Sequence, residues 1–266
     1  MKRTLIVGNW KMNLNTHEAS LLVKRLNDKI QVHRDVEVVL APSLLTLQPI
    51  SLEIDRRKFR LAAQNAYYKD EGAYTGEVSF TMLRDLVNYV IIGHSERRIY
   101  FEESLELIRD KVQAAVRNGI TPILCVGETQ NQRAAGETSR VVHDQVVTAL
   151  SNLTAEEVEG IVIAYEPVWA ISTFGGQVAK PDDMEKVLKL IRHQITELYG
   201  DKAAASVRLI YGGSVKGDTA SGYLALEDCD GLLPGSASLN YHQFPDIVAA
   251  AYRQTRGAGD EEKSNG

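Results

Sequence analysis

Eight short apolar segments recur along the 266-residue chain, and they constrain its fold more than any other feature. They occupy residues 4–9, 36–42, 60–65, 89–94, 122–128, 161–166, 207–213 and 230–236. Each is bounded by turn residues and lacks alternation between polar and apolar positions. That pattern is typical of strands buried on both faces, as in a parallel sheet. We therefore expect eight buried parallel strands.

Helical periodicity fills the gaps between these segments. The clearest case lies between Pro181 and Gly200, which suit a helix start and a helix stop. Its apolar positions are Met184, Val187, Leu188, Ile191, Ile195 and Leu198. Two earlier gaps carry the same spacing at Ala19, Leu22, Val23, Leu26 and Ile30, and at Leu105, Ile108, Val112 and Val116 before Asn118-Gly119. These gaps are predicted to be amphipathic helices.

Strand followed by helix, repeated eight times, indicates an α/β protein with a (β/α)8 barrel, a fold of about 250 residues. A doubly wound open sheet is the alternative fold. No linker divides the chain, so we expect residues 1–256 to form a single barrel domain. Residues 257–266 are small or charged and bury little apolar area, which predicts a loose C-terminal tail.

Charge and composition exclude several classes of partner. The formal net charge of -5 and the pI near 5.7 argue against nucleic acid and acidic membrane surfaces as partners. No apolar stretch approaches the length of a membrane span, and no export signal is visible. Cys125 and Cys229 lie in strand-like apolar surroundings, so we expect two free buried thiols and a cytoplasmic location.

Polar residues gather where the predicted strands end, which is the face of a barrel that carries active sites. They are Asn9 and Lys11 after the first strand, His94 after the fourth, Glu166 after the sixth, "YGGS" (211–214) after the seventh and "PGS" (234–236) after the eighth. The set combines one base, one group that exchanges protons near neutral pH, one cation and two turns rich in backbone N–H groups. Such turns after the last two strands often bind phosphate. These features favour general acid–base chemistry on a small phosphorylated substrate.

Each of these residues also has an ordinary structural interpretation. His94 could cap a helix, Lys11 could be a solvated surface residue, and the glycines of "YGGS" could simply turn the chain. Glu166 is harder to explain in that way, because Pro167 and Trp169 surround it with apolar groups. The coincidence of all these residues at one face favours a site.

Cofactor and metal signatures fail on inspection. Asp218 stands where a phosphate-binding P-loop requires Lys, and no GxGxxG follows the first strand. The six histidines show no spacing typical of metal ligands. We expect an enzyme with neither cofactor nor metal.

Together the motifs resemble those of the triosephosphate isomerase family. The resemblance runs from residue 3 to about residue 252 and rests on "GNWKMN", "QNAYYKDEGAYTGE", "VIIGHSERR", "CVGE", "AYEPVWAI", "YGGSV" and "DGLLPGSASL". It implies interconversion of dihydroxyacetone phosphate and D-glyceraldehyde 3-phosphate through an enediolate, in glycolysis and gluconeogenesis. A barrel that binds phosphorylated metabolites or a protein partner without turnover is the alternative function.

The resemblance also implies roles for single residues. Glu166 matches the family's catalytic base, and His94 matches the neutral imidazole that polarises the carbonyl. Asn9 and Lys11 match the groups that orient the substrate and stabilise negative charge, and Glu96 would anchor Lys11. The segment after Trp169 resembles a closing lid.

Phosphate binding and assembly follow from the resemblance in the same way. It implies backbone contacts to the phosphate at Ser172, Ser214, Gly235 and Ser236. The loop around Thr75 resembles the family's docking loop, which implies a homodimer. Two segments depart from the family pattern: the lid "AISTFGGQVAKP" is longer, and the last strand carries Pro234 and Ser236 in place of Val and Gly.

Overall fold

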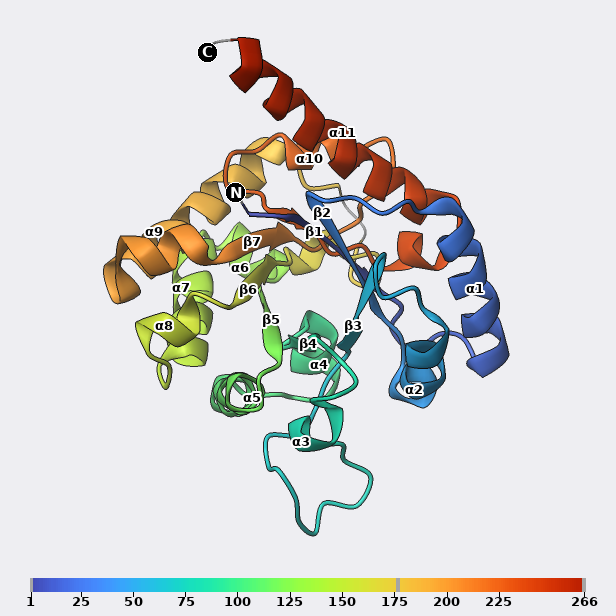
Figure 1. The fold of residues 1–266 in the computed structure, drawn as a ribbon. Coiled ribbons are helices and arrows are strands. Elements are labelled where there is room, and N and C mark those ends of the chain that lie inside the picture. The colour runs from blue at the N-terminus through green and yellow to red at the C-terminus, as the bar shows by residue number, and fades with distance from the viewer. Residues whose placement is uncertain (1, 176–177, 265–266) are drawn as a thin grey trace.

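Eight parallel strands close into a barrel in the order β1 to β8, each hydrogen-bonded to the next, in a computed structural model that describes residues 2–175 and 178–264 (Figure 1). The strands are β1 (Thr4–Asn9), β2 (Val36–Ala41), β3 (Phe59–Ala63), β4 (Tyr89–Ile92), β5 (Thr121–Val126), β6 (Val162–Tyr165), β7 (Arg208–Tyr211) and β8 (Gly231–Leu232). β1 pairs with β8 at Leu5–Gly231 and Ile6–Leu232, a closure that an open sheet lacks. The predicted barrel is confirmed.

Helices cover the outside of the barrel and connect successive strands (Figure 1). They are α1 (Thr16–Lys29), α2 (Leu44–Glu53), α3 (Phe80–Leu83), α4 (Ser95–Tyr100), α5 (Leu105–Arg117), α6 (Gln130–Ala134), α7 (Thr138–Leu150), α8 (Ala155–Val158), α9 (Pro181–Ser206), α10 (Ala220–Leu224) and α11 (Gln243–Ser264), with the short 3-10 helices η1 (Val168–Ala170) and η2 (Ser236–Leu239). Caps set several of their starts. Asn15, for example, begins α1 with a capping box in which its side chain and that of Glu18 each accept a backbone N–H.

The continuous apolar runs bury both faces of the strands, one inside the barrel and one under the helices. The interior cluster consists of Leu5, Val7, Val39, Ala41, Ala62, Tyr89, Ile91, Ile123, Cys125, Val162, Ala164, Ile210 and Leu233. A larger cluster joins the outward faces of the strands to the helices. β8 crosses close to β1, and a Cβ on Gly231 would lie 1.9 Å from the carbonyl oxygen of Leu5. Only glycine fits there.

Three details differ from the sequence-based expectations. Gly200 leaves helical geometry (φ 83°, ψ 169°) as predicted, but a second helical segment follows directly, so α9 continues to Ser206. Leu198, just before this break, is 47% exposed rather than buried. The backbone of α11 is helical through Ser264 and extends beyond the barrel (Figure 1), into the segment expected to be a loose tail. That segment has no proline to stop a helix, and residues 265–266 lie outside the described part of the chain.

Candidate active site

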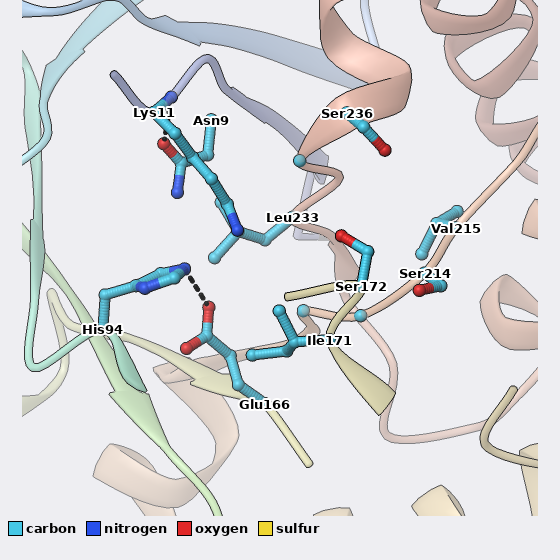
Figure 2. A pocket seen from close by; sticks show the side chains of 13 residues that line it. Asn9, Lys11, His94, Glu166, Ile171, Ser172, Ser214, Val215, Leu233 and Ser236 are labelled. Atoms are coloured by element: carbon cyan, nitrogen blue, oxygen red, sulfur yellow. Dashed lines mark hydrogen bonds and ion pairs between the residues drawn. The ribbon is translucent and has the colours of Figure 1, made fainter. Parts of the chain in front are cut away.

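One pocket at the carboxyl ends of the strands collects every residue that the sequence predicts for the site (Figure 2). These are Asn9, Lys11, His94, Glu166, Ser172, Ser214, Gly235 and Ser236. Its other lining residues are Ile171, Gly212, Gly213, Val215 and Leu233. The sequence reasoning missed the three apolar walls, Ile171, Val215 and Leu233, although all three lie within the recognised motifs. The sequence could have indicated these residues only through their closeness to the polar site residues, because apolar side chains carry no chemical signature of their own.

Glu166 lies just past the end of β6 and is almost completely buried, with 2% of its surface exposed. Its backbone N–H donates to the carbonyl of Val126 at 2.7 Å, which continues the β5–β6 ladder one residue beyond the strand. One carboxylate oxygen is 3.3 Å from Nε2 of His94, and the other accepts the backbone N–H of Ser95 at 3.4 Å. The Glu166 carboxylate therefore points into the pocket and toward the imidazole of His94 (Figure 2).

His94 both caps a helix and faces the base. Its Nδ1 accepts the backbone N–H of Glu96 at 3.2 Å, at the start of α4. Because Nδ1 is an acceptor, the ring proton of the neutral imidazole belongs on Nε2, the nitrogen beside Glu166. The structural interpretation of His94 as a helix cap is thus correct, and its functional role stays a prediction that its place beside Glu166 favours.

Lys11 is held in an unusual backbone conformation near the start of the loop after β1. Its φ of 51° is left-handed, which costs about 1–2 kcal/mol for a residue with a side chain. Two side chains hold it there: Oδ1 of Asn9 accepts the Lys11 N–H at 3.0 Å, and Gln64 donates to the Lys11 carbonyl at 2.8 Å. The ammonium group points into the pocket (Figure 2). Strain of this kind is typical of residues that are positioned for function.

Glu96 anchors the ammonium group, as the family resemblance implies. Its Oε1 accepts from Nζ of Lys11 at 2.6 Å. Burial alone would raise the pKa of Glu96, but the hydrogen bond from Lys11 and the charge of its ammonium group outweigh burial and leave the pKa below its ordinary value. The carboxyl group therefore stays ionised at neutral pH and keeps Lys11 paired.

The turn after β7 packs tightly against the base and against the start of the lid. A Cβ on Gly212 would lie 2.7 Å from Cγ of Glu166, so only glycine leaves room for the acid there. The hydroxyl of Ser214 donates to the carbonyl of Ala170 at 2.9 Å. With its hydroxyl occupied in this way, Ser214 offers a ligand its backbone N–H.

The lid segment begins at a firmly held hinge. Trp169 donates its indole N–H to Oε1 of Glu128 at 2.9 Å, and the guanidinium of Arg133 stacks 4.2 Å from the centroid of the Trp169 ring. Tyr165 donates to the same carboxylate at 3.1 Å. Two hydrogen bonds to the fully buried Glu128, together with the stacking of Arg133 on Trp169, fix the backbone on both sides of Glu166.

The described part of the lid tip contacts α4. The Thr173 hydroxyl donates to Oε1 of Glu96 at 2.9 Å, the same oxygen that binds Lys11. The Phe174 ring packs on Tyr100 with centroids 5.5 Å apart. Gly176, which the sequence places in the lengthened tip, lies outside the described residues together with Gln177.

The two thiols are free and buried, as expected. Burial, followed by the charge of nearby Glu166, raises the pKa of the Cys125 thiol well above its ordinary value. A thiol that stays protonated is a poor nucleophile. In the described part of the chain, no group of three or more His, Cys, Asp or Glu side chains is placed to hold a metal ion. Within the same residues, no helix is both long and apolar enough to cross a membrane.

Comparison with known proteins assigns this arrangement to one family. The family model described as triosephosphate isomerase matches residues 4–251, nearly the whole chain. The chain belongs to the triosephosphate isomerase family. Triosephosphate isomerases from Carboxydothermus hydrogenoformans and Caldanaerobacter subterraneus are each 45% identical over 249 residues, 93% of this chain and 98% and 99% of theirs. The Clostridium tetani triosephosphate isomerase is 43% identical over 93% of this chain and 96% of its own.

For a triosephosphate isomerase, the pocket has a clear division. The base, the imidazole and the cation lie on one side, and the turns after β7 and β8 lie on the other (Figure 2). A small substrate that spans the pocket would place its carbons and its phosphate in different surroundings. The site therefore has the two halves that the family's reaction needs.

Proposed function

We propose that Glu166 is the base with which this triosephosphate isomerase interconverts dihydroxyacetone phosphate and D-glyceraldehyde 3-phosphate. The carboxylate removes a proton from the carbon next to the carbonyl, and the C–H electron pair forms the C=C bond of an enediolate. A proton then passes from the hydroxyl oxygen to the enediolate oxygen, and return of the first proton to the neighbouring carbon gives the isomer. The observation that carries this role is the buried Glu166 carboxylate 3.3 Å from Nε2 of His94 in the pocket.

His94, Lys11 and Asn9 stabilise the negative charge that develops on the substrate's carbonyl oxygen. The Nε2–H of neutral His94 donates to the carbonyl oxygen that becomes the enediolate oxygen. The ammonium group of Lys11 supplies the positive charge near that oxygen, and Asn9 supports it through the bond from the Lys11 backbone N–H. These donors are positioned before the substrate arrives, so little reorganisation is needed during the reaction.

The phosphate binds through backbone N–H groups at Ser172, Ser214, Gly235 and Ser236. Gly235 and Ser236 begin the 3-10 helix η2, whose first N–H groups have no partner in the helix itself. A Cβ on Gly235 would lie 3.3 Å from Cε of Lys11, which brings this turn close to the cation. A dianion is held there by N–H groups and by the nearby ammonium charge.

The active form is a homodimer in which the loop containing Thr75 docks into a second copy. Residues 71–77 are exposed and extend from the body of the protein, between β3 and α3 (Figure 1). A second pocket lies beside the active site, shares Lys11 and His94 with it, and includes the exposed side chains of Met12 (95%) and Phe101 (64%). We expect the exposed loop of one copy to fill this apolar pocket of the other copy and to pack against the catalytic groups that line it. The two free thiols fit a cytoplasmic enzyme.

A coupled isomerase assay on Glu166→Gln tests the central role. The substitution keeps the size and removes the charge, so kcat should fall by about 10²-fold to 10⁴-fold with the fold intact. Activity within threefold of the parent would rule out Glu166 as the base. A parent chain that binds the substrate without turnover would instead support the binding-only alternative.

A further inference from the structure

Two buried tyrosines connect the end of the lid to the turn after β7. Tyr223 on α10 is 2% exposed, and its hydroxyl donates to the carbonyl of Ala179 at 2.9 Å. Its ring packs on that of Tyr211, with centroids 4.5 Å apart. Tyr211 is the last residue of β7 and immediately precedes the Gly212-Gly213 turn.

The carbonyl of Ala179 needs this donor. Ala179 is 1% exposed and lies outside α9, whose first backbone bonds run to the carbonyl of Lys180 from Asp183 (3.0 Å) and Met184 (3.3 Å). Pro181, two residues after Ala179, has no N–H to offer. A buried carbonyl without a partner is costly, so the Tyr223 hydroxyl determines where the chain is held at residue 179.

The Tyr211 hydroxyl lies directly under the turn. A Cβ on Gly213 would be 2.2 Å from this oxygen, which is a closer approach than any side chain permits. Among the described residues the Tyr211 hydroxyl has no hydrogen-bond partner, so ring packing is what holds it in place. A shift of the Tyr211 ring would therefore move Gly213 and the backbone that lines the pocket.

Both ends of the lid are thus tied to one turn. Its start is joined by the bond from Ser214 to the carbonyl of Ala170, and its end by the path from Ala179 through Tyr223 to Tyr211. We propose that Tyr223 is a positioning residue for isomerisation, which holds the end of the lid against the turn at residues 212–214 and so sets where that turn meets the substrate phosphate. This inference rests on the proposed phosphate contacts of that turn. Tyr223 itself touches no reacting atom.

The test is Tyr223→Phe, which removes the hydroxyl and keeps the ring. Two rates are compared: kcat/KM for D-glyceraldehyde 3-phosphate, and the rate of proton exchange into D-glyceraldehyde, which lacks the phosphate, followed by NMR in D2O. We expect the first to fall about tenfold, the effect of one buried hydrogen bond, and the second to stay within twofold. Thermal stabilisation by inorganic phosphate, measured without turnover, should weaken in parallel.

Tyr199→Phe is the matched control. The Tyr199 hydroxyl donates to the carbonyl of Leu150 at 2.7 Å and joins α9 to α7 away from the pocket. It should lower Tm and leave both rates unchanged. If Tyr223→Phe lowers both rates equally, or leaves kcat/KM and the phosphate effect unchanged, the positioning role is overturned. A parent chain without isomerase activity would refute the proposed function instead, so the two failures are distinct.

Discussion

Gly212→Ala should displace Glu166, the proposed base, without replacing any charged residue. The added Cβ would lie 2.7 Å from Cγ, 3.1 Å from Oε1 and 3.4 Å from Cδ of Glu166. Carbon atoms in contact prefer about 3.5–4.0 Å, so the Glu166 side chain must move by about 1 Å. Its backbone cannot share that movement, because a Cβ on Gly127 would already lie 2.0 Å from the Glu166 carbonyl oxygen.

The size of the effect follows from this displacement. A misplacement of about 1 Å at a reacting group costs about 10²-fold in rate. We therefore expect kcat to fall about 10²-fold with KM nearly unchanged, since the extra methyl faces the base rather than the phosphate turns. Overpacking should also lower the free energy of unfolding by about 1–3 kcal/mol.

The assay measures kcat and KM in both directions, with Tm from thermal unfolding. Gly160→Ala is the matched control, because its Cβ would meet nothing closer than the carbonyl oxygen of Glu157 at 3.7 Å. That variant should behave like the parent. If Gly212→Ala folds normally and keeps more than a third of the parent kcat, the close fit between the turn and the base has no catalytic importance.

Two further substitutions and one loop deletion test other parts of the protein. Lys11→Met should lower kcat/KM by about 10²-fold to 10³-fold, because the variant lacks a group that stabilises developing charge. The control, Met in place of the exposed Lys24, should have no effect on kcat/KM. Full turnover by Lys11→Met would show that Lys11 is not part of the site. Shortening residues 69–77 should give a weakly active monomer by light scattering, and a shortened protein that stays dimeric contradicts the docking role. Phe174→Ala should raise KM, lower kcat and increase the methylglyoxal formed per turnover by loss of phosphate from the enediolate, because the lid tip loses its packing on Tyr100. An unchanged ratio of methylglyoxal to isomerised product, with unchanged KM, would exclude Phe174 from lid closure.

Much of the fold was predictable because its signals are local. An apolar run bounded by turns, a helical spacing or a glycine such as Gly200 can be recognised within about 20 residues. The two-residue strand β8 was recognisable only as one of eight runs, and its register depends on β1, more than 220 residues away. The helical end of α11 shows the opposite case, where composition predicted a loose tail and the backbone continues a helix already begun.

The site was predictable for a different reason. Barrel topology brings all strand ends to one face, so residues far apart in sequence, such as Lys11 and Glu166, could be placed together without knowing a single contact. Contacts between loops have no such rule. The left-handed backbone of Lys11 and the bond from Tyr223 to Ala179, 44 residues apart, depend on tertiary packing and leave no periodic signal.

The two cations nearest to Glu166 make their hydrogen bonds to other groups. The ammonium group of Lys11 is already paired with Glu96, and the guanidinium of Arg98 donates to the carbonyl of Cys125 at 2.8 Å. Glu166 is left with neutral donors, the backbone N–H of Ser95 and the imidazole of His94. Two neutral N–H donors thus hold the Glu166 carboxylate in position at the wall of the pocket, where the carbon of a bound substrate would meet it.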